Sequence, residues 1–131
     1  MFLDSPACRV LLVDNDIEAC QQMAEILTQQ GCSVVCAHDA AAALDMIPLS
    51  VPEVVFVDFA MDDLDGYQIV AQSLKWQVDA ALLVAMTDLS DAATRLRVKR
   101  TGFHMHLVKP ERLDVMLLAS SSRSGRATLM H

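Results

Sequence analysis

The stretch EVVFVD, residues 53–58, decides the fold of this chain. Four consecutive apolar residues, Val54 to Val57, lead directly into an aspartate. A run that is apolar at every position fits a strand buried on both faces, and parallel sheets bury their strands in this way. Asp58 therefore stands where a buried strand would reach the edge of a sheet.

Four further short apolar runs lie on either side of this stretch, and longer segments separate them. The first of those segments has helical spacing, with Ile17, Cys20, Ala24 and Leu27 at three- and four-residue steps. Five strands that alternate with helices predict an α/β domain, a doubly wound parallel sheet with helices on both faces. The other apolar runs are RVLLV (9–13), SVVCA (33–37), ALLVAM (81–86) and HMHLV (104–108).

Local signals predict where two of the helices begin and end. Asp16 and Asp39 stand just before helical spacing, where an aspartate can accept hydrogen bonds from the first free backbone N–H groups. Gly31 and Pro48 follow the last periodic residues of these segments. We therefore expect the first helix to end before Gly31 and the second before Pro48.

Composition excludes several classes of protein. The 131 residues suffice for one ordinary domain. A net charge of −7 argues against nucleic-acid binding, because phosphate backbones require clusters of Lys and Arg. No apolar run approaches the roughly 20 residues that span a bilayer. The first ten residues lack the basic start and apolar stretch of a secretory signal, so we expect a cytoplasmic protein with no membrane contact.

The four cysteines do not form a metal-binding or redox motif. No two of them are spaced as CxxC, and no second Cys or His pair follows at zinc spacing. We expect reduced thiols that pack as small apolar side chains. The residues are Cys8, Cys20, Cys32 and Cys36.

Polar side chains stand at four of the five expected strand ends. Parallel strands bring their carboxyl ends to one edge of the sheet, where ligands bind in folds of this class. We therefore expect one polar site there. The residues are Asp14, Asn15 and Asp16 after the first run, Asp58 with Asp62, Asp63 and Asp65 after the third, Thr87 and Asp88 after the fourth, and Lys109 after the fifth.

This set suits the transfer of a phosphoryl group to a carboxylate. Crowded carboxylates repel one another unless a cation lies among them, and Mg²⁺ takes a few oxygen ligands together with water and a phosphate group. A carboxylate beside the ion can attack the phosphoryl group, and a hydroxyl and an ammonium can bind the transferred oxygens. Each residue alone could equally be a helix cap or an ordinary strand end. Together, Asp14, Asp58, Thr87 and Lys109 indicate a phosphoryl-acceptor site.

From about Arg9 to Ala119 the chain resembles the receiver domains of bacterial response regulators. The resemblance rests on four motifs, and with the strand–helix alternation it predicts the strand order 2-1-3-4-5. It divides the chain into an N-terminal extension over 1–8, a receiver domain over 9–119 and a flexible tail or linker stub over 120–131. The motifs are VLLVDND (10–16), VVFVDFAMDDLDGYQIV (54–70), LLVAMTD (82–88) and GFHMHLVKP (102–110).

The resemblance implies a role for each site residue. Asp58 would accept the phosphoryl group, Thr87 would be the switch residue and Lys109 would contact the phosphate. Mg²⁺ would be held by Asp14, Asn15, Asp58 and the backbone carbonyl of Ala60. Transfer and later autodephosphorylation would be self-catalysed, so the chain is not expected to be a conventional enzyme.

The resemblance also implies the partners. The phosphoryl donor would be a sensor histidine kinase or a phosphotransfer protein, and a downstream protein target would read the result. Phosphorylation would remodel the surface around the fourth helix and fifth strand, where a second copy of the domain is one candidate partner. His106 stands where the family often has an aromatic switch residue, and a half-buried ring without that role fits equally well.

Three departures from the family pattern leave an alternative open. Asn15 replaces an acid of the usual pair, Asp62 replaces a usual Pro, and Asp88 replaces a usual small residue. A degenerate receiver that binds proteins without being phosphorylated is the resulting alternative. A flavin- or nucleotide-binding domain of the same fold is disfavoured, because VDNDIEA (13–19) is not a phosphate-cradling loop.

Overall fold

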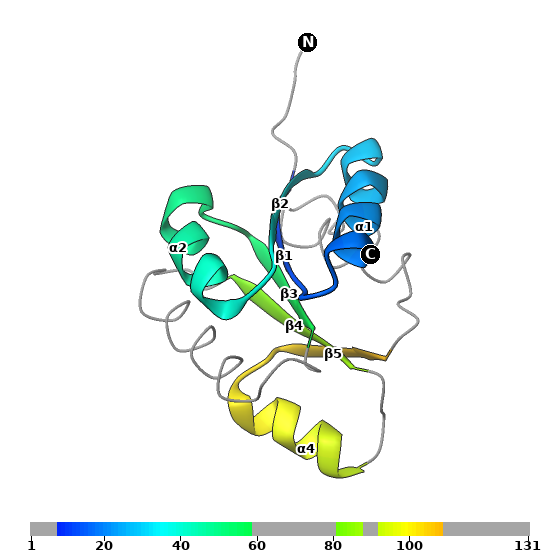
Figure 1. Cartoon of the computed structure of the whole chain (residues 1–131). Helices are drawn as coiled ribbons and strands as arrows, with labels where there is room; N and C mark the ends of the chain where they lie inside the picture. Colours follow the sequence, from blue (N-terminus) through cyan, green and yellow to red (C-terminus); the bar gives the residue numbers. More distant parts are fainter. Residues whose placement is uncertain (1–7, 59–80, 88–91, 109–131) are drawn as a thin grey trace, which may run out of the picture.

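The computed structural model describes residues 8–58, 81–87 and 92–108. Within these residues, five parallel strands form a single sheet in the order β2-β1-β3-β4-β5 (Figure 1). Both the predicted fold class and the predicted strand order are confirmed. The strands are β1 (Arg9–Val13), β2 (Ser33–Ala37), β3 (Val54–Asp58), β4 (Leu82–Thr87) and β5 (Met105–Val108).

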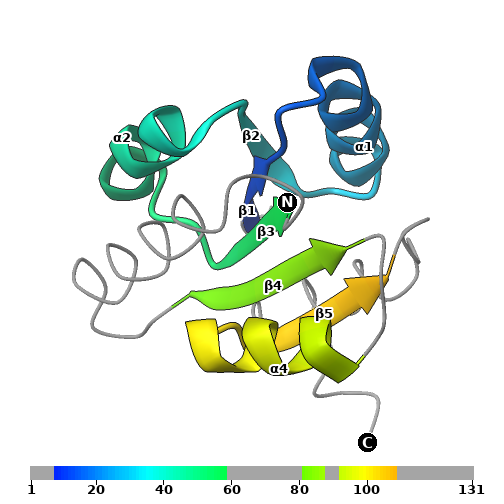
Figure 2. The ribbon, with the colours of Figure 1, turned by 60° about the horizontal axis from the view of Figure 1, so that its bottom comes forward.

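Helices cover both faces of this sheet (Figures 1 and 2). α1 (Ile17–Gln29) packs on one face, while α2 (Ala40–Ser50) and α4 (Ala92–Thr101) pack on the other. Successive strand residues point to opposite faces, so Leu12 belongs to the core under α1 and Leu11 to the core under α2. None of the helices in the described ranges combines the length and apolar character needed to cross a bilayer.

Two strands extend one residue further than the sequence predicts, and each of them includes a predicted site residue. Asp58 and Thr87 are the last residues of β3 and β4, whereas the apolar runs predict that they follow the strands. Pairing of Asp58 with Met86 and of Thr87 with Val108 keeps both residues within the sheet. Their backbones are therefore held by neighbouring strands.

The predicted helix caps are confirmed. The Asp16 carboxylate accepts a hydrogen bond from the Ala19 N–H at 3.1 Å, and Asp39 accepts one from the Ala42 N–H at 2.8 Å. Each bond satisfies a backbone donor that has no partner within its helix. After α1 the chain turns at Gly31 with φ of +98°, a conformation that glycine adopts without steric cost.

The prediction that Pro48 ends the second helix is wrong. α2 continues to Ser50 and ends at Val51, which has φ of 45°. Proline removes one backbone donor, but the last turn keeps other bonds: the Val51 N–H donates to the Ile47 carbonyl at 3.0 Å. The Ser50 hydroxyl also donates to the Met46 carbonyl, at 2.7 Å. These bonds near the helix end let the turn tolerate the proline.

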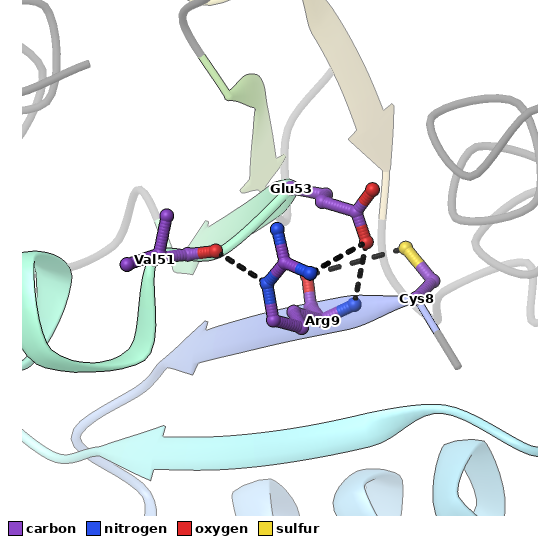
Figure 3. A network of polar contacts seen from close by, with 4 residues as sticks. All are labelled: Cys8, Arg9, Val51 and Glu53. Atoms are coloured by element: carbon purple, nitrogen blue, oxygen red, sulfur yellow. Dashed lines mark hydrogen bonds and ion pairs between the residues drawn. The ribbon is translucent and has the colours of Figure 1, made fainter. Parts of the chain in front are cut away.

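A polar network joins the end of α2 to the start of β1 and β3 (Figure 3). The Arg9 side chain donates from Nε to the Val51 carbonyl at 2.7 Å, and the Arg9 backbone N–H donates to Glu53 Oε1 at 3.0 Å. A cation at a helix C-terminus is favourable for the helix dipole. The Arg9–Glu53 ion pair itself is 3.9 Å long and partly exposed, so we expect it to contribute little.

The four cysteines are reduced thiols, as predicted. Cys8, Cys20 and Cys32 are buried in the core between α1 and the sheet, and the half-buried Cys36 packs against that core. The Cys8 carbonyl also accepts a hydrogen bond from the Ser33 N–H at 2.9 Å. Cys8, the last residue of the expected N-terminal extension, is thus integrated into the core.

Candidate functional site

The carboxyl ends of β1, β3 and β4 bring Asp14, Asp58 and Thr87 to one edge of the sheet. Val13 pairs with Val57, so Asp14 lies beside Asp58 one step further along both strands. On the other side of β3, Thr87 is the residue just past the partner of Asp58. Neighbouring strands lie about 4.7–4.9 Å apart. Three of the predicted site residues are therefore adjacent.

All three of these side chains are buried. Asp14 is 7% exposed, and Asp58 and Thr87 are each 4% exposed. Two ionised carboxylates on adjacent strands repel one another, and low exposure to water increases that repulsion. The edge of the sheet is therefore a place where a cation would be favourable.

Asp14 is held in a defined position by bonds from its own and neighbouring segments. Its backbone N–H donates to the Ala37 carbonyl of β2 at 3.0 Å. Its carboxylate accepts a hydrogen bond from the Asp16 N–H at 2.9 Å. The turn from β1 into α1 thus leaves the Asp14 carboxylate anchored at the sheet edge.

Asn15 and Asp16 differ from Asp14 in being exposed. One carboxylate oxygen of Asp16 serves as the N-cap of α1, in the bond from Ala19 described above. Asp16 is the nearest acid that could replace the missing charge at Asn15, but one of its carboxylate oxygens is already used to cap α1. Asn15 is therefore a neutral residue at a position where the motif usually has an acid.

Thr87 contacts a residue that the sequence analysis did not connect to it. The Thr87 hydroxyl forms a hydrogen bond with Nε2 of His106 on β5. His106 pairs with Ala85, two residues before Thr87, so both side chains lie on the same face of the sheet. Burial, and then the positive charge of Arg95, lowers the pKa of His106. The half-buried ring expected at this position is confirmed; a switching role remains a prediction.

Several predicted site residues lie outside the described residues. These are Lys109, Ala60 and the loop and rim acids at 62, 63, 65 and 88. Within the described ranges, no three His, Cys, Asp or Glu side chains gather in a way suited to a metal ion. The expected magnesium ligands include only two such residues there, Asp14 and Asp58.

Comparison with known proteins identifies the family. Residues 10–120 match the model of the response regulator receiver domain. The chain belongs to this family. It is a receiver domain of the kind used in two-component systems, as the motifs predict.

Two relatives match the chain over part of their own length. It is 30% identical over 122 residues to the probable transcriptional regulator ycf27 of Guillardia theta, covering 91% of this chain. It is 32% identical over 109 residues to the response regulator MprA of Mycobacterium avium, covering 83% of this chain. The aligned part is 47% of either relative, so the chain spans about half of their length.

Solved structures agree with the fold. The receiver domain of the Francisella response regulator 1452 superposes with a TM-score of 0.78 at 22% identity, over 91% of this chain and 98% of that one. The chemotaxis protein CheY4 of Vibrio cholerae superposes with a TM-score of 0.75 at 25% identity, over 85% and 93% of the two chains. Both likenesses extend over nearly the whole of the solved chains.

Proposed function

We propose that this receiver domain is a phosphorylation-dependent switch whose acceptor is Asp58. The donor is the phosphohistidine of a sensor histidine kinase or of a phosphotransfer protein. The single observation that carries the proposal is the position of Asp58: it ends the buried strand β3, beside Asp14 and next to the strand that ends in Thr87. Asp58 and Asp14 are both buried there, and two neighbouring buried carboxylates are costly for the fold unless a cation offsets their repulsion, so this arrangement favours a site for Mg²⁺ and a phosphoryl group.

The residues at the sheet edge fit Mg²⁺. Mg²⁺ is usually bound by one or two carboxylates, with water and substrate phosphate completing its shell. Asp14 and Asp58 supply two hard oxygen ligands from adjacent strands. We assign Asn15 and the Ala60 carbonyl to the same ligand set, from the sequence motif. The ion would neutralise charge on the incoming phosphate.

The remaining roles follow from charge and position. A carboxylate oxygen of Asp58 attacks phosphorus as the phosphorus–nitrogen bond of the donor breaks, and the electron pair leaves with the imidazole. A bound phosphoryl group adds about 1.5–2 negative charges at neutral pH. We assign the Lys109 ammonium and the Thr87 hydroxyl to binding its oxygens. Movement of Thr87 toward the phosphate would then disturb its bond with His106.

The acceptor is tested with a small phosphodonor. The chain is incubated with acetyl phosphate and Mg²⁺, and the intact mass is followed over time. One phosphoryl adduct is expected on the unaltered protein and none on Asp58→Asn. Asp45→Asn on α2 is the matched control, because Asp45 is an exposed acid of the same type away from the edge, and it should be labelled normally.

Two outcomes would count against this assignment. Uptake of the label by Asp58→Asn at the unaltered rate would show that another residue is the acceptor. Failure of the unaltered protein to take up any label, from acetyl phosphate or from a phosphorylated kinase, would favour the second candidate below.

The second candidate is a degenerate receiver that binds partner proteins without phosphorylation. Its support is the neutral, exposed Asn15, which leaves the edge with less negative charge for Mg²⁺ than an acid would. One oxygen of the neighbouring Asp16 carboxylate is used by the α1 cap. The labelling experiment separates the two candidates directly.

We propose that phosphorylation alters the surface around α4 and β5, which a downstream protein or a second copy of the domain then recognises. Binding measured with phosphorylated and unphosphorylated protein tests this output, and equal affinity in both states would contradict it.

We assign the receiver domain to residues 9–119, between an extension over 1–8 and a linker stub over 120–131.

A further inference from the structure

Two cysteine thiols from different elements meet in the core between α1 and the sheet. α1 packs beside β2 (Figure 1). The Cys36 thiol on β2 contacts the Cys20 carbonyl on α1, with a sulfur–oxygen distance of 3.7 Å. Burial, and then the nearby Cys36 thiol, raises the pKa of the Cys20 thiol. The thiols are thus direct neighbours, although 16 positions separate them in the chain.

The strand register places both sulfur atoms near one residue. Cys36 pairs with Leu12 across β1 and β2. The Cys20 thiol contacts the Leu12 carbonyl, with a sulfur–oxygen distance of 3.7 Å. Cys20 and Cys36 therefore converge from the helix and from the strand onto the same point of β1.

The two thiols differ in access to solvent. Cys36 is half-buried, whereas Cys20 is only 2% exposed. A small reagent from solution can therefore reach Cys36 first. A void of about 10 Å³, lined by Cys20, Met23 and Met86 among others, lies next to the inner thiol.

We propose that Cys20 and Cys36 form a reversible disulfide when the protein meets a hydroperoxide. This proposal does not rest on the proposed phosphorylation of Asp58. The bond would tie α1 to β2 and close a loop that the reduced chain leaves open. Cytoplasmic disulfides of this kind are usually transient and redox-sensing.

The chemistry balances with the peroxide as the oxidant. The Cys36 sulfur, after losing its proton, attacks one peroxide oxygen and forms a sulfenic acid, and the other oxygen leaves as hydroxide. The Cys20 sulfur then loses its proton and attacks the Cys36 sulfur. The sulfur–sulfur bond forms as the sulfur–oxygen bond breaks and water leaves. The two thiols together give two electrons to the peroxide, and two molecules of water result when the oxidant is hydrogen peroxide.

The other two cysteines provide an internal comparison. Cys8 and Cys32 directly precede the amino-terminal ends of β1 and β2, and they are 0% and 8% exposed. Neither offers the half-exposed thiol with which peroxide reacts. We therefore expect them to stay reduced under conditions that oxidise Cys20 and Cys36.

The native chain is treated with hydrogen peroxide, its remaining thiols are alkylated, and it is cleaved after glutamate. Cleavage after Glu25 separates Cys20 from Cys36, so a disulfide joins two peptides that otherwise separate. The expected result is this linked pair, lost on addition of dithiothreitol. The oxidised protein should unfold at a higher temperature, because the bond restricts the unfolded chain.

Three variants sharpen the test. Cys32→Ala should keep the linked peptides, which identifies Cys36 as the partner within its peptide. Cys20→Ser should leave a sulfenic acid on Cys36, trapped by dimedone. Cys36→Ser should form no disulfide. The proposal is overturned if peroxide yields only higher oxides of Cys36, if the linkage joins Cys8 to Cys32, or if only intermolecular disulfides form.

Discussion

The Thr87 hydroxyl on β4 and the His106 ring on β5 form a hydrogen bond across adjacent strands. Thr87 is buried at the edge that also holds Asp58, while His106 lies half-buried beside α4. The pair therefore connects the candidate phosphoryl site with a groove of about 320 Å³ between α4 and β5, lined by Arg95, Lys99 and His106 among others.

We expect the stability of the protein to depend on pH through His106. Burial and Arg95 lower the pKa of His106 below its ordinary value of 6.5. The unfolded chain therefore binds a proton at His106 more readily than the folded chain does. This residue lowers the free energy of unfolding as pH falls through about 6.5 toward the lowered pKa, and its effect vanishes above that window.

His106→Asn removes the titrating group and should reduce this acid-dependent loss. Urea unfolding of both proteins at about pH 7.5 and about pH 5.5 measures it. The difference in unfolding free energy between the two proteins should shift in favour of the variant at the lower pH. A difference that is the same at both pH values would contradict the prediction.

Asp58→Asn should retain the fold and have equal or greater thermal stability without Mg²⁺. The substitution is nearly isosteric and removes one of two neighbouring buried carboxylates, which repel one another when ionised. Differential scanning calorimetry measures the midpoint. The exposed Asp45→Asn variant should change stability by no more than about 0.5 kcal/mol. A clear loss of stability in Asp58→Asn alone would contradict the prediction.

Asn15→Asp should tighten Mg²⁺ binding. Two unit charges about 4 Å apart attract by about 1 kcal/mol in water, and roughly twice that for a divalent ion. Because Asn15 is exposed, we expect a gain on the order of tenfold in affinity. Isothermal titration calorimetry measures it, with the neutral Asn15→Ser as control. Unchanged or weaker binding would remove residue 15 from the ligand set.

Val51→Asn should stabilise the protein by about 1 kcal/mol. Val51 has φ of 45°, a conformation that is costly for a β-branched residue and more acceptable for asparagine. Its side chain is 50% exposed, so little apolar packing is lost. Chemical denaturation measures the change, and Leu49→Asn, at an exposed helical position, should give no gain. A loss at residue 51 would mean that the valine packing outweighs the backbone strain.

Asp39→Ala should cost about 1 kcal/mol of stability. The side chain accepts the Ala42 N–H at the start of α2, and alanine leaves that donor without its protein partner. Asp39→Asn should retain most of the stability, because the amide oxygen can accept the same bond. Equal losses in both variants would indicate that charge, and not the cap, is responsible.

Local patterns in the sequence determined most of the architecture. The unbroken apolar run from Val54 to Val57 requires a strand buried on both faces, and the caps at Asp16 and Asp39 depend only on residues three positions away. The acids Asp14 and Asp58 could be assigned to one edge because parallel strands all end on the same side. The strand and the caps are short-range features, and the shared edge follows from the common direction of parallel strands, so the sequence alone sufficed to predict them.

Only the tertiary structure decided which distant side chains meet. The bond between Thr87 and His106 depends on the register of β4 against β5, and the contact of Cys20 with Cys36 depends on how α1 lies over β2. The continuation of α2 past Pro48 likewise depends on bonds made around the helix end. Register and packing result from the burial of the whole core. The sequence of a single segment therefore does not determine them.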